Sequence, residues 1–174
     1  MVALIGPMGV GKSTIGKSLA AELHYSFLDT DQIIEERTGA DIGWIFDVEG
    51  EAGFRDREHA LLKELLVDRA EPSVIATGGG IVVREDNREL LQGCDAVIYL
   101  KADLDQLIAR TARDKKRPLL QVDNREQQIR KLMEERHPLY EQISTATVCA
   151  NRRNPKQVAS EIVALIRDKL ANLD

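Results

Sequence analysis

Short runs of apolar residues alternate along the chain with longer segments in which apolar residues recur every three or four positions. The short runs cover residues 2–5, 26–28, 74–76, 96–100 and 147–149. Runs of this length are typical of buried strands, and the periodic segments between them are typical of amphipathic helices. Strands separated by helices predict an α/β fold. A parallel sheet then carries helices on both faces, and ligands bind at the carboxyl ends of the strands.

Two of these helices have clear sequence signals. Ile15, Leu19 and Leu23 recur at intervals of four residues and therefore share one face of a helix. Near the other end of the chain, Asn154–Pro155 predicts a helix start, with asparagine as the N-cap and proline at the first helical position.

Length and composition predict one ordinary domain. The 174 residues suit a single unit, residues 1–174, and the sequence contains no repeat or low-complexity linker. Hydrophobic residues make up 43% of the chain, which is enough for a core, and charged residues make up 30%. The net charge of −5 argues against a dedicated nucleic-acid binder. No exposed apolar helix face stands out, so we expect a monomer.

The sequence also bears on location and redox chemistry. The first ten residues lead directly into a functional motif and do not resemble a signal peptide, and the apolar runs are far too short to span a bilayer. We therefore expect a cytoplasmic protein with no membrane partner. Cys94 and Cys149 each lie in or near an apolar run, which predicts two buried free thiols rather than a disulfide.

A phosphate-binding loop is the clearest motif. Residues 6–13, Gly-Pro-Met-Gly-Val-Gly-Lys-Ser, match G-x-x-x-x-G-K-[ST] between a predicted strand and a predicted helix. Gly9 and Gly11 let the backbone turn its N–H groups toward phosphate oxygens. Lys12 is expected to reach the β- and γ-phosphates, and Ser13 to offer a hydroxyl to Mg²⁺. The alternative is a glycine-rich turn before an ordinary helix, which the matching context disfavours.

A phosphate loop alone does not separate kinases from GTPase switches or ATP-driven machines. Residues 100–103 lack the asparagine of a guanine-reading Asn-Lys-x-Asp segment, and no apolar strand ends in Asp-Glu. After the second strand, Asp29 and Asp31 can face the same cleft. One suits Mg²⁺ held through water, and the other suits a base that accepts a proton from a substrate hydroxyl. On spacing alone, the pair serves equally well as a cap for the next helix.

Arginine and glycine segments supply further candidates, each with two interpretations. Arg55 begins a long amphipathic helix and suits either anion binding or a solvated helix face. The three glycines at 78–80 follow the third strand and either let a ligand approach the backbone or form a loose turn. Residues 110–117 contain five basic residues and one acidic residue. This segment suits a solvated basic face or a mobile lid in which Arg117 faces the transferring phosphoryl group.

Taken together, these segments resemble the shikimate kinase family, P-loop kinases that phosphorylate the 3-hydroxyl of shikimate. The resemblance covers nearly the whole chain, and the matching segments are residues 6–14, 29–31, 50–58, 77–80, 117–120 and 136–140. Many families share the phosphate loop. The combination of Asp-x-Asp, Phe-Arg, triple glycine, Arg-Pro-Leu-Leu and Arg-x-Pro-Leu-Tyr is specific to this family.

The resemblance implies a three-layer P-loop kinase fold with a five-stranded parallel sheet. It also implies a substrate-binding helical segment near residues 31–60 and a mobile lid near residues 110–124. The implied activity uses ATP and Mg²⁺ to convert shikimate into shikimate 3-phosphate, a step toward chorismate and the aromatic amino acids.

The resemblance also implies roles residue by residue. ATP would be bound by Gly9, Val10, Gly11, Lys12, Ser13, Thr14, Arg110, Arg117 and Arg153. Within this set, Arg110 and Arg153 would flank the adenine, and Arg117 would lie over the phosphates. Shikimate would be bound by Asp31, Arg55, Gly78, Gly79, Gly80 and Arg136. Mg²⁺ would be held by Ser13 and Asp29, and the catalytic residues would be Lys12, Asp31 and Arg117. The apolar wall of the substrate pocket would be Ile42, Phe46 and Phe54, with Glu58 positioning an arginine.

Two alternatives stand beside this interpretation: a related small-molecule kinase and, from another functional class, a non-catalytic module. A gluconate or nucleoside-monophosphate kinase shares the phosphate loop and lid, but we find no pocket that would read a nucleotide base. A non-catalytic ATP-binding module has little reason to keep both Asp29 and Asp31 beside Lys12.

Overall fold

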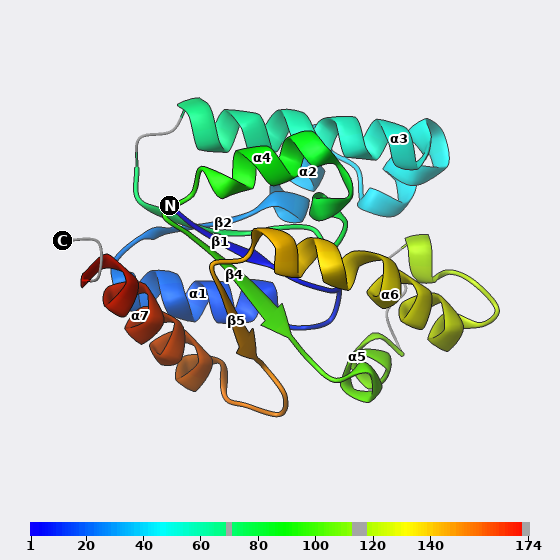
Figure 1. Cartoon of the computed structure of the whole chain (residues 1–174). Helices are drawn as coiled ribbons and strands as arrows, with labels where there is room; N and C mark the ends of the chain where they lie inside the picture. The colour runs from blue at the N-terminus through cyan, green and yellow to red at the C-terminus, as the bar shows by residue number, and fades with distance from the viewer. Residues whose placement is uncertain (69–70, 113–117, 172–174) are drawn as a thin grey trace.

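The computed structural model describes residues 1–68, 71–112 and 118–171 (Figure 1). Within these residues, five strands form one parallel sheet in the order β2-β3-β1-β4-β5. The strands are β1 (Val2–Ile5), β2 (Ser26–Asp29), β3 (Ser73–Ala76), β4 (Ala96–Lys101) and β5 (Ala146–Cys149). The predicted parallel sheet is therefore confirmed, and each strand lies within one residue of its expected position.

Helices cover both faces of the sheet, which gives the three layers expected from the sequence (Figure 1). One face carries α1 (Lys12–Leu23) and α7 (Pro155–Ala171). The other carries α3 (Ile42–Lys63), α4 (Glu85–Gln92) and α6 (Arg125–Ile143). The shorter helices α2 (Thr30–Thr38) and α5 (Leu104–Thr111) follow the carboxyl ends of β2 and β4.

The strands read as unbroken apolar runs because both of their faces are buried. Within β1, Leu4 packs in the core on the α1 and α7 side, whereas Ala3 and Ile5 pack on the α4 and α6 side. Alternate residues of a strand point to opposite faces, so a strand covered on both sides needs apolar residues throughout. The loops that bear the candidate site residues begin at the carboxyl ends of these buried strands.

The start of α7 confirms the predicted helix cap. The Asn154 side-chain oxygen accepts a hydrogen bond of 2.9 Å from the Lys156 backbone N–H, and the Asn154 carbonyl accepts one from Val158. These bonds satisfy the donors and acceptors of a first helical turn, with Pro155 at the position where no N–H is needed.

The helix that carries Arg55 begins earlier than the sequence pattern indicated. It starts at Ile42 behind Asp41, whose side chain caps the Trp44 N–H at 2.7 Å. The helix is interrupted at Gly50, whose φ of 71° is readily adopted only by glycine. This break separates the first turns of α3, which bear Ile42 and Phe46, from the part that bears Phe54, Arg55 and Glu58.

Two smaller expectations have different outcomes. Cys94 and Cys149 are free, as predicted, but Cys94 is only half-buried and Cys149 is exposed. The prediction of two buried thiols was therefore wrong, because Cys149 is the last residue of β5 and points away from the core. Partial burial raises the pKa of the Cys94 thiol to about 11. No helix in the described part of the chain has the length and apolar character needed to cross a membrane.

Candidate active site

The loop after β1 curls tightly around a space at the carboxyl edge of the sheet. Gly9 and Gly11 have φ values of 78° and 105°, which favour glycine. Space is also short at Gly9, since a Cβ there would lie 2.8 Å from Cγ2 of Thr111 on α5. Gly11 is the residue before α1, so the loop passes directly into the positive end of that helix.

Two cations lie on this loop. The Lys12 ammonium donates hydrogen bonds to the carbonyls of Gly6 at 2.7 Å and Pro7 at 2.9 Å. From the far side, Nη1 of Arg110 donates to the carbonyls of Gly9 at 3.3 Å and Val10 at 2.9 Å. Positive charge is therefore concentrated where phosphate oxygens would enter.

Asp29 connects this loop to α2. Its Oδ2 accepts a hydrogen bond of 2.6 Å from the Ser13 hydroxyl, and its Oδ1 accepts one of 3.3 Å from the Gln32 N–H. Asp29 is thus the N-cap of α2 and also a partner of Ser13, so the two interpretations of this residue are compatible. A hydroxyl and a carboxylate form an all-oxygen donor pair of the kind that Mg²⁺ prefers.

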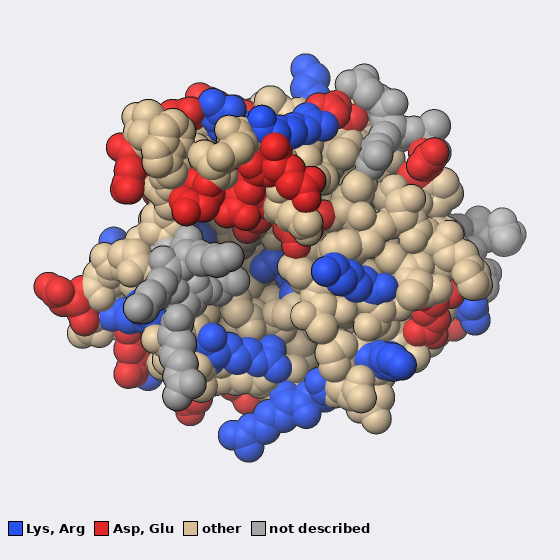
Figure 2. Space-filling model, turned by 180° about the vertical axis from the view of Figure 1, so that it is seen from behind, with Lys and Arg blue, Asp and Glu red and all other residues tan. Residues whose placement is uncertain are grey.

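Two adjoining cavities open at this edge of the sheet. The phosphate cavity has a volume of about 820 Å³ and is lined by Met8, Gly9, Gly11, Lys12, Ser13, Thr14, Asp29, Asp31, Thr77, Gly79 and Arg110. The acceptor cavity has a volume of about 480 Å³ and is lined by Met8, Asp31, Ile42, Phe46, Phe54, Arg55, Glu58, Gly78, Gly79, Gly80, Pro118, Leu119 and Arg136. Figure 2 shows a hollow in this face with lysine and arginine side chains inside it and acidic side chains above it.

Arg55 is held by two carboxylates on its own helix. Its Nη1 donates to Glu58 Oε2 at 2.7 Å, while Nε and Nη2 donate to Glu51 Oε1 at 3.3 and 3.0 Å. Arg55 and Glu58 are buried, at 8% and 0% exposure, so their ion pair is shielded from water. The guanidinium is fixed in direction by these two carboxylates, and its remaining N–H groups suit a further carboxylate that arrives from the cavity.

Glu58 sits in an unusual environment for a carboxylate. Burial raises the pKa of its carboxyl group above the ordinary value, although the neighbouring Arg55 guanidinium acts against this rise. Among the described residues, its Oε1 has no hydrogen-bond partner. Oε1 lies 2.5 Å from the point where a Cβ would stand at Gly78, and Oδ1 of Asp31 lies 2.8 Å from the same point. The glycine therefore allows both carboxyl groups to approach the backbone.

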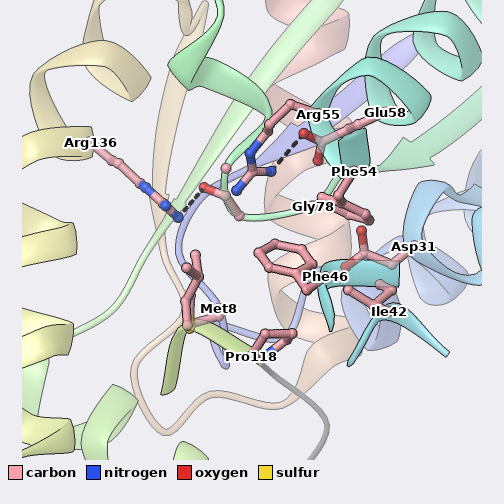
Figure 3. Close-up of a pocket in the computed structure, with 13 residues that line it drawn as sticks. Met8, Asp31, Ile42, Phe46, Phe54, Arg55, Glu58, Gly78, Pro118 and Arg136 are labelled. Carbon is pink, nitrogen blue, oxygen red and sulfur yellow. Dashed lines mark hydrogen bonds and ion pairs between the residues drawn. The ribbon is translucent and has the colours of Figure 1, made fainter. Parts of the chain in front are cut away.

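Arg136 reaches the same glycine segment from α6. Its Nη1 donates to the Gly79 carbonyl at 3.3 Å, and the Tyr140 hydroxyl donates a short hydrogen bond to the same oxygen. Figure 3 shows Arg136 and Arg55 approaching the glycine segment from opposite sides. Two buried guanidinium groups thus converge on one small space, which is suited to a small anion.

The remaining wall of the acceptor cavity is apolar. Phe46 and Phe54 contact each other with ring centroids 5.0 Å apart, beside Ile42. In Figure 3, Met8 lies to the left of Phe46 and Pro118 lies below it. An apolar wall facing two arginines favours a ligand with a carboxylate at one end and a hydrocarbon ring.

Comparison with known proteins identifies the family. The model of the family described as shikimate kinase matches residues 8–167. The chain belongs to the shikimate kinase family. A shikimate kinase of Vibrio parahaemolyticus is 50% identical over 168 residues, which cover 97% of this chain and 96% of that one. A shikimate kinase of Pseudomonas paraeruginosa is 54% identical over 164 residues, or 94% of each chain.

A solved structure gives the same result for the fold. The shikimate kinase from Acinetobacter baumannii in complex with shikimate superposes with a TM-score of 0.93 at 45% identity. The match covers 97% of this chain and 93% of that one. Both the resemblance seen in the motifs and the three-layer P-loop kinase fold are confirmed.

Most of the residues that the sequence singled out come together around the two cavities of this family member. The side chain of Val10 is an exception, since it is buried in the core and only its carbonyl faces a site residue. Arg153 lines neither cavity; it donates to the Cys149 carbonyl at 3.1 Å and pairs with Glu161 at 2.5 Å. Arg117 lies outside the described residues, so its role stays a prediction.

Several residues at the site were not assigned a role from the sequence. Thr30 is fully buried, and its hydroxyl accepts the Gly78 N–H at 3.0 Å. Tyr140 could have been inferred from its place four residues after Arg136, on the same helix face. Met8 and Leu119 lie within the matching segments 6–14 and 117–120, but nothing in the sequence placed their apolar side chains in the acceptor cavity.

Proposed function

We propose that this chain transfers the γ-phosphate of ATP to the 3-hydroxyl of shikimate by using the two adjoining cavities as nucleotide and acceptor sites. As a member of the shikimate kinase family, it is an ATP- and Mg²⁺-dependent enzyme. The observation that carries the assignment of roles is the position of Asp31. Its side chain lines both cavities, so one carboxylate faces the phosphate loop and the acceptor space together.

On the nucleotide side, the backbone of residues 9–14 binds the phosphates. The Lys12 ammonium group interacts with the negative charge of the γ-phosphate. Ser13 and Asp29 would hold Mg²⁺, which would supply positive charge against the developing negative charge of the transferring group. The described residues contain no cluster of three or more His, Cys, Asp or Glu that could enclose a metal alone.

On the acceptor side, Arg55 and Arg136 bind the carboxylate of shikimate together with the glycine backbone at 78–80. The apolar wall then contacts the ring. With both ends fixed, the 3-hydroxyl lies near Asp31, and holding the reactants in this geometry removes much of the barrier.

The transfer step follows from these positions. The hydroxyl oxygen bonds to the γ-phosphorus while the bond from that phosphorus to the β–γ bridging oxygen breaks, and ADP leaves. The hydroxyl proton passes to Asp31, which acts as the general base. Arg110 stabilises the loop that bears the phosphates. Arg117 and Arg153 keep their expected roles toward the phosphates and adenine as predictions.

Release of ADP tests the proposed function directly. The enzyme is incubated with ATP, Mg²⁺ and either shikimate, quinate, gluconate, AMP or no acceptor. Turnover with shikimate alone is the expected result. Turnover with another acceptor would mean that Arg55, Arg136 and the glycine segment have structural roles only. The assignment of the phosphate loop would stand.

We further propose that the enzyme acts as a monomer in the cytoplasm, as its sequence suggests. Light scattering coupled to size-exclusion chromatography would give the mass of one 19.4 kDa chain. A mass of twice that value would contradict this part of the proposal.

A further inference from the structure

The segment at 78–80 binds the acceptor through its backbone, yet it has no side chains of its own to hold it in place. On the cavity side it is tied at two points. The Gly78 N–H donates to the Thr30 hydroxyl at 3.0 Å, and the Gly79 carbonyl accepts from Tyr140 and Arg136. Glycine has the greatest backbone freedom of any residue, so the position of this segment depends on what surrounds it.

On the side away from the cavity, two neighbouring residues of α4 bind the turn that follows the glycines. This turn, Ile81–Val83, presents three successive carbonyls. Nδ2 of Asn87 donates to the Ile81 carbonyl at 3.1 Å. Nη1 of Arg88 donates to the next two carbonyls at 2.8 and 3.2 Å. Every carbonyl of the turn therefore has a side-chain donor from the same helix.

Asn87 also reaches the helix that carries the carboxylate-binding arginine. It is fully buried, and its Oδ1 lies 2.7 Å from Nδ1 of His59 on α3. An amide oxygen only accepts hydrogen bonds, so Nδ1 of His59 carries the proton. His59 directly follows Glu58, the residue that holds Arg55. One buried amide thus connects the backbone just after Gly80 to the helix that bears Arg55.

The contact between Arg55 and Gly80 makes this connection matter for binding. A Cβ at Gly80 would overlap the Arg55 guanidinium, so the arginine lies directly against the glycine backbone. A shift of the turn relative to α3 would change the space between the guanidinium and the backbone N–H groups. Small displacements of binding groups carry large kinetic penalties.

We propose that Asn87 is a positioning residue for the acceptor site. Through its two hydrogen bonds, to Ile81 and His59, Asn87 holds the glycine segment in place against α3. The residue does not touch the acceptor and acts only through the backbone it holds. This proposal rests on the proposed function, because it assigns the glycine segment to the acceptor carboxylate.

The test compares Asn87→Leu and Asn87→Asp with Arg84→Ala as a matched control. Leucine is similar in size to asparagine and loses both bonds. Aspartate keeps the acceptor for His59 but loses the donor to Ile81. Arg84 joins the same two helices, through Asp56 of α3 and Asp86 of α4, without donating to the turn. Steady-state kinetics and calorimetric titration with shikimate are measured for all four proteins, well below their unfolding temperatures.

Both Asn87 variants should raise the KM and the dissociation constant for shikimate about tenfold, with the KM for ATP changed less than about twofold. Arg84→Ala should leave both constants near those of the parent. A lower unfolding temperature with unchanged shikimate constants in either folded Asn87 variant would overturn the proposal, because it would reduce Asn87 to a packing residue. Failure of the proposed function would look different, since the parent enzyme itself would not phosphorylate shikimate.

Discussion

The phosphate cavity takes just over half of its lining residues from one short segment, residues 8–14, whereas the acceptor cavity draws on α2, α3, α6 and the glycine segment. In the proposed function, the first binds its ligand mainly through backbone N–H groups at a helix start. The second relies on side chains that reach one point from distant parts of the chain. Arg55 and Arg136 are far apart in sequence, yet both contact or flank the same three glycines.

This difference has a physical consequence. A backbone cradle is complete once the local turn forms, so it depends little on the rest of the molecule. The acceptor cavity instead needs buried charges such as Arg55 and Glu58, and each must be paired where it is out of water. Substitutions in the acceptor cavity should therefore act on one substrate, while substitutions shared by both cavities should act on the chemical step.

The largest effect is expected at the residue that the two cavities share. Asp31→Asn keeps the size of the side chain but removes the base, so kcat should fall by about 10²- to 10⁴-fold. Asp47→Asn, at an exposed position of α3, serves as the control. Rapid-quench measurement of phosphoryl transfer tests this, and a normal rate would mean that positioning alone supports catalysis.

The next largest effect is expected on the acceptor cavity alone. Arg136 is 6% exposed, and truncating a buried charge that binds an oppositely charged group costs roughly 2 kcal/mol or more. Arg136→Ala should therefore raise the KM for shikimate at least about 30-fold while ATP binding stays near normal. Arg130→Ala on the same helix removes only a surface pair with Glu126 and should have little effect. Equal losses for both substrates would contradict the division between the cavities.

A smaller effect is expected on the nucleotide side. Ser13→Ala removes one oxygen donor and the 2.6 Å bond that orients Asp29. The Mg²⁺ concentration needed for half-maximal activity should rise about tenfold, with the KM for shikimate unchanged. Ser18→Ala alters the same helix at an exposed hydroxyl that bonds only Thr14. If the two variants need the same Mg²⁺ concentration, Ser13 does not bind the ion.

The same difference between the cavities explains what the sequence could predict. The strand–loop–helix geometry at the phosphate loop was predicted correctly, because it lies within one contiguous motif. The parallel sheet and its layers followed from the alternation of apolar runs with amphipathic helices, since a parallel sheet buried on both faces leaves such a pattern. Asp29 illustrates the limit, because spacing alone did not show that one residue caps α2 and also binds Ser13.

The acceptor cavity was predicted from the family resemblance rather than from local pattern. Nothing near Arg136 indicates that its guanidinium meets the Gly79 carbonyl, since that contact depends on how α6 packs over the sheet. The contacts of Asn87 and Thr30 were missed for the same reason. A buried polar residue is recognisable only when its partners are known, and these partners are backbone groups of distant segments.

The smallest effect concerns the buried carboxyl group of Glu58 and its dependence on pH. Burial raises its pKa in the folded protein, so over a window above the ordinary glutamate value the folded state holds a proton that the unfolded chain has released. The contribution of Glu58 protonation to the free energy of unfolding is thus fully present below the pKa that Glu58 has in the unfolded chain. The free energy of unfolding should fall as pH rises through this window.

Glu58→Gln removes the titration while keeping the shape of the side chain. Its free energy of unfolding should therefore depend less on pH over the same window, whereas Glu49→Gln, which alters an exposed partner of Arg57, should follow the parent there. Urea unfolding of the three proteins at a series of pH values measures the difference directly. Parallel curves for the parent and Glu58→Gln would mean that Arg55 holds Glu58 ionised throughout. The acceptor cavity would then carry a permanent buried ion pair rather than a titrating one.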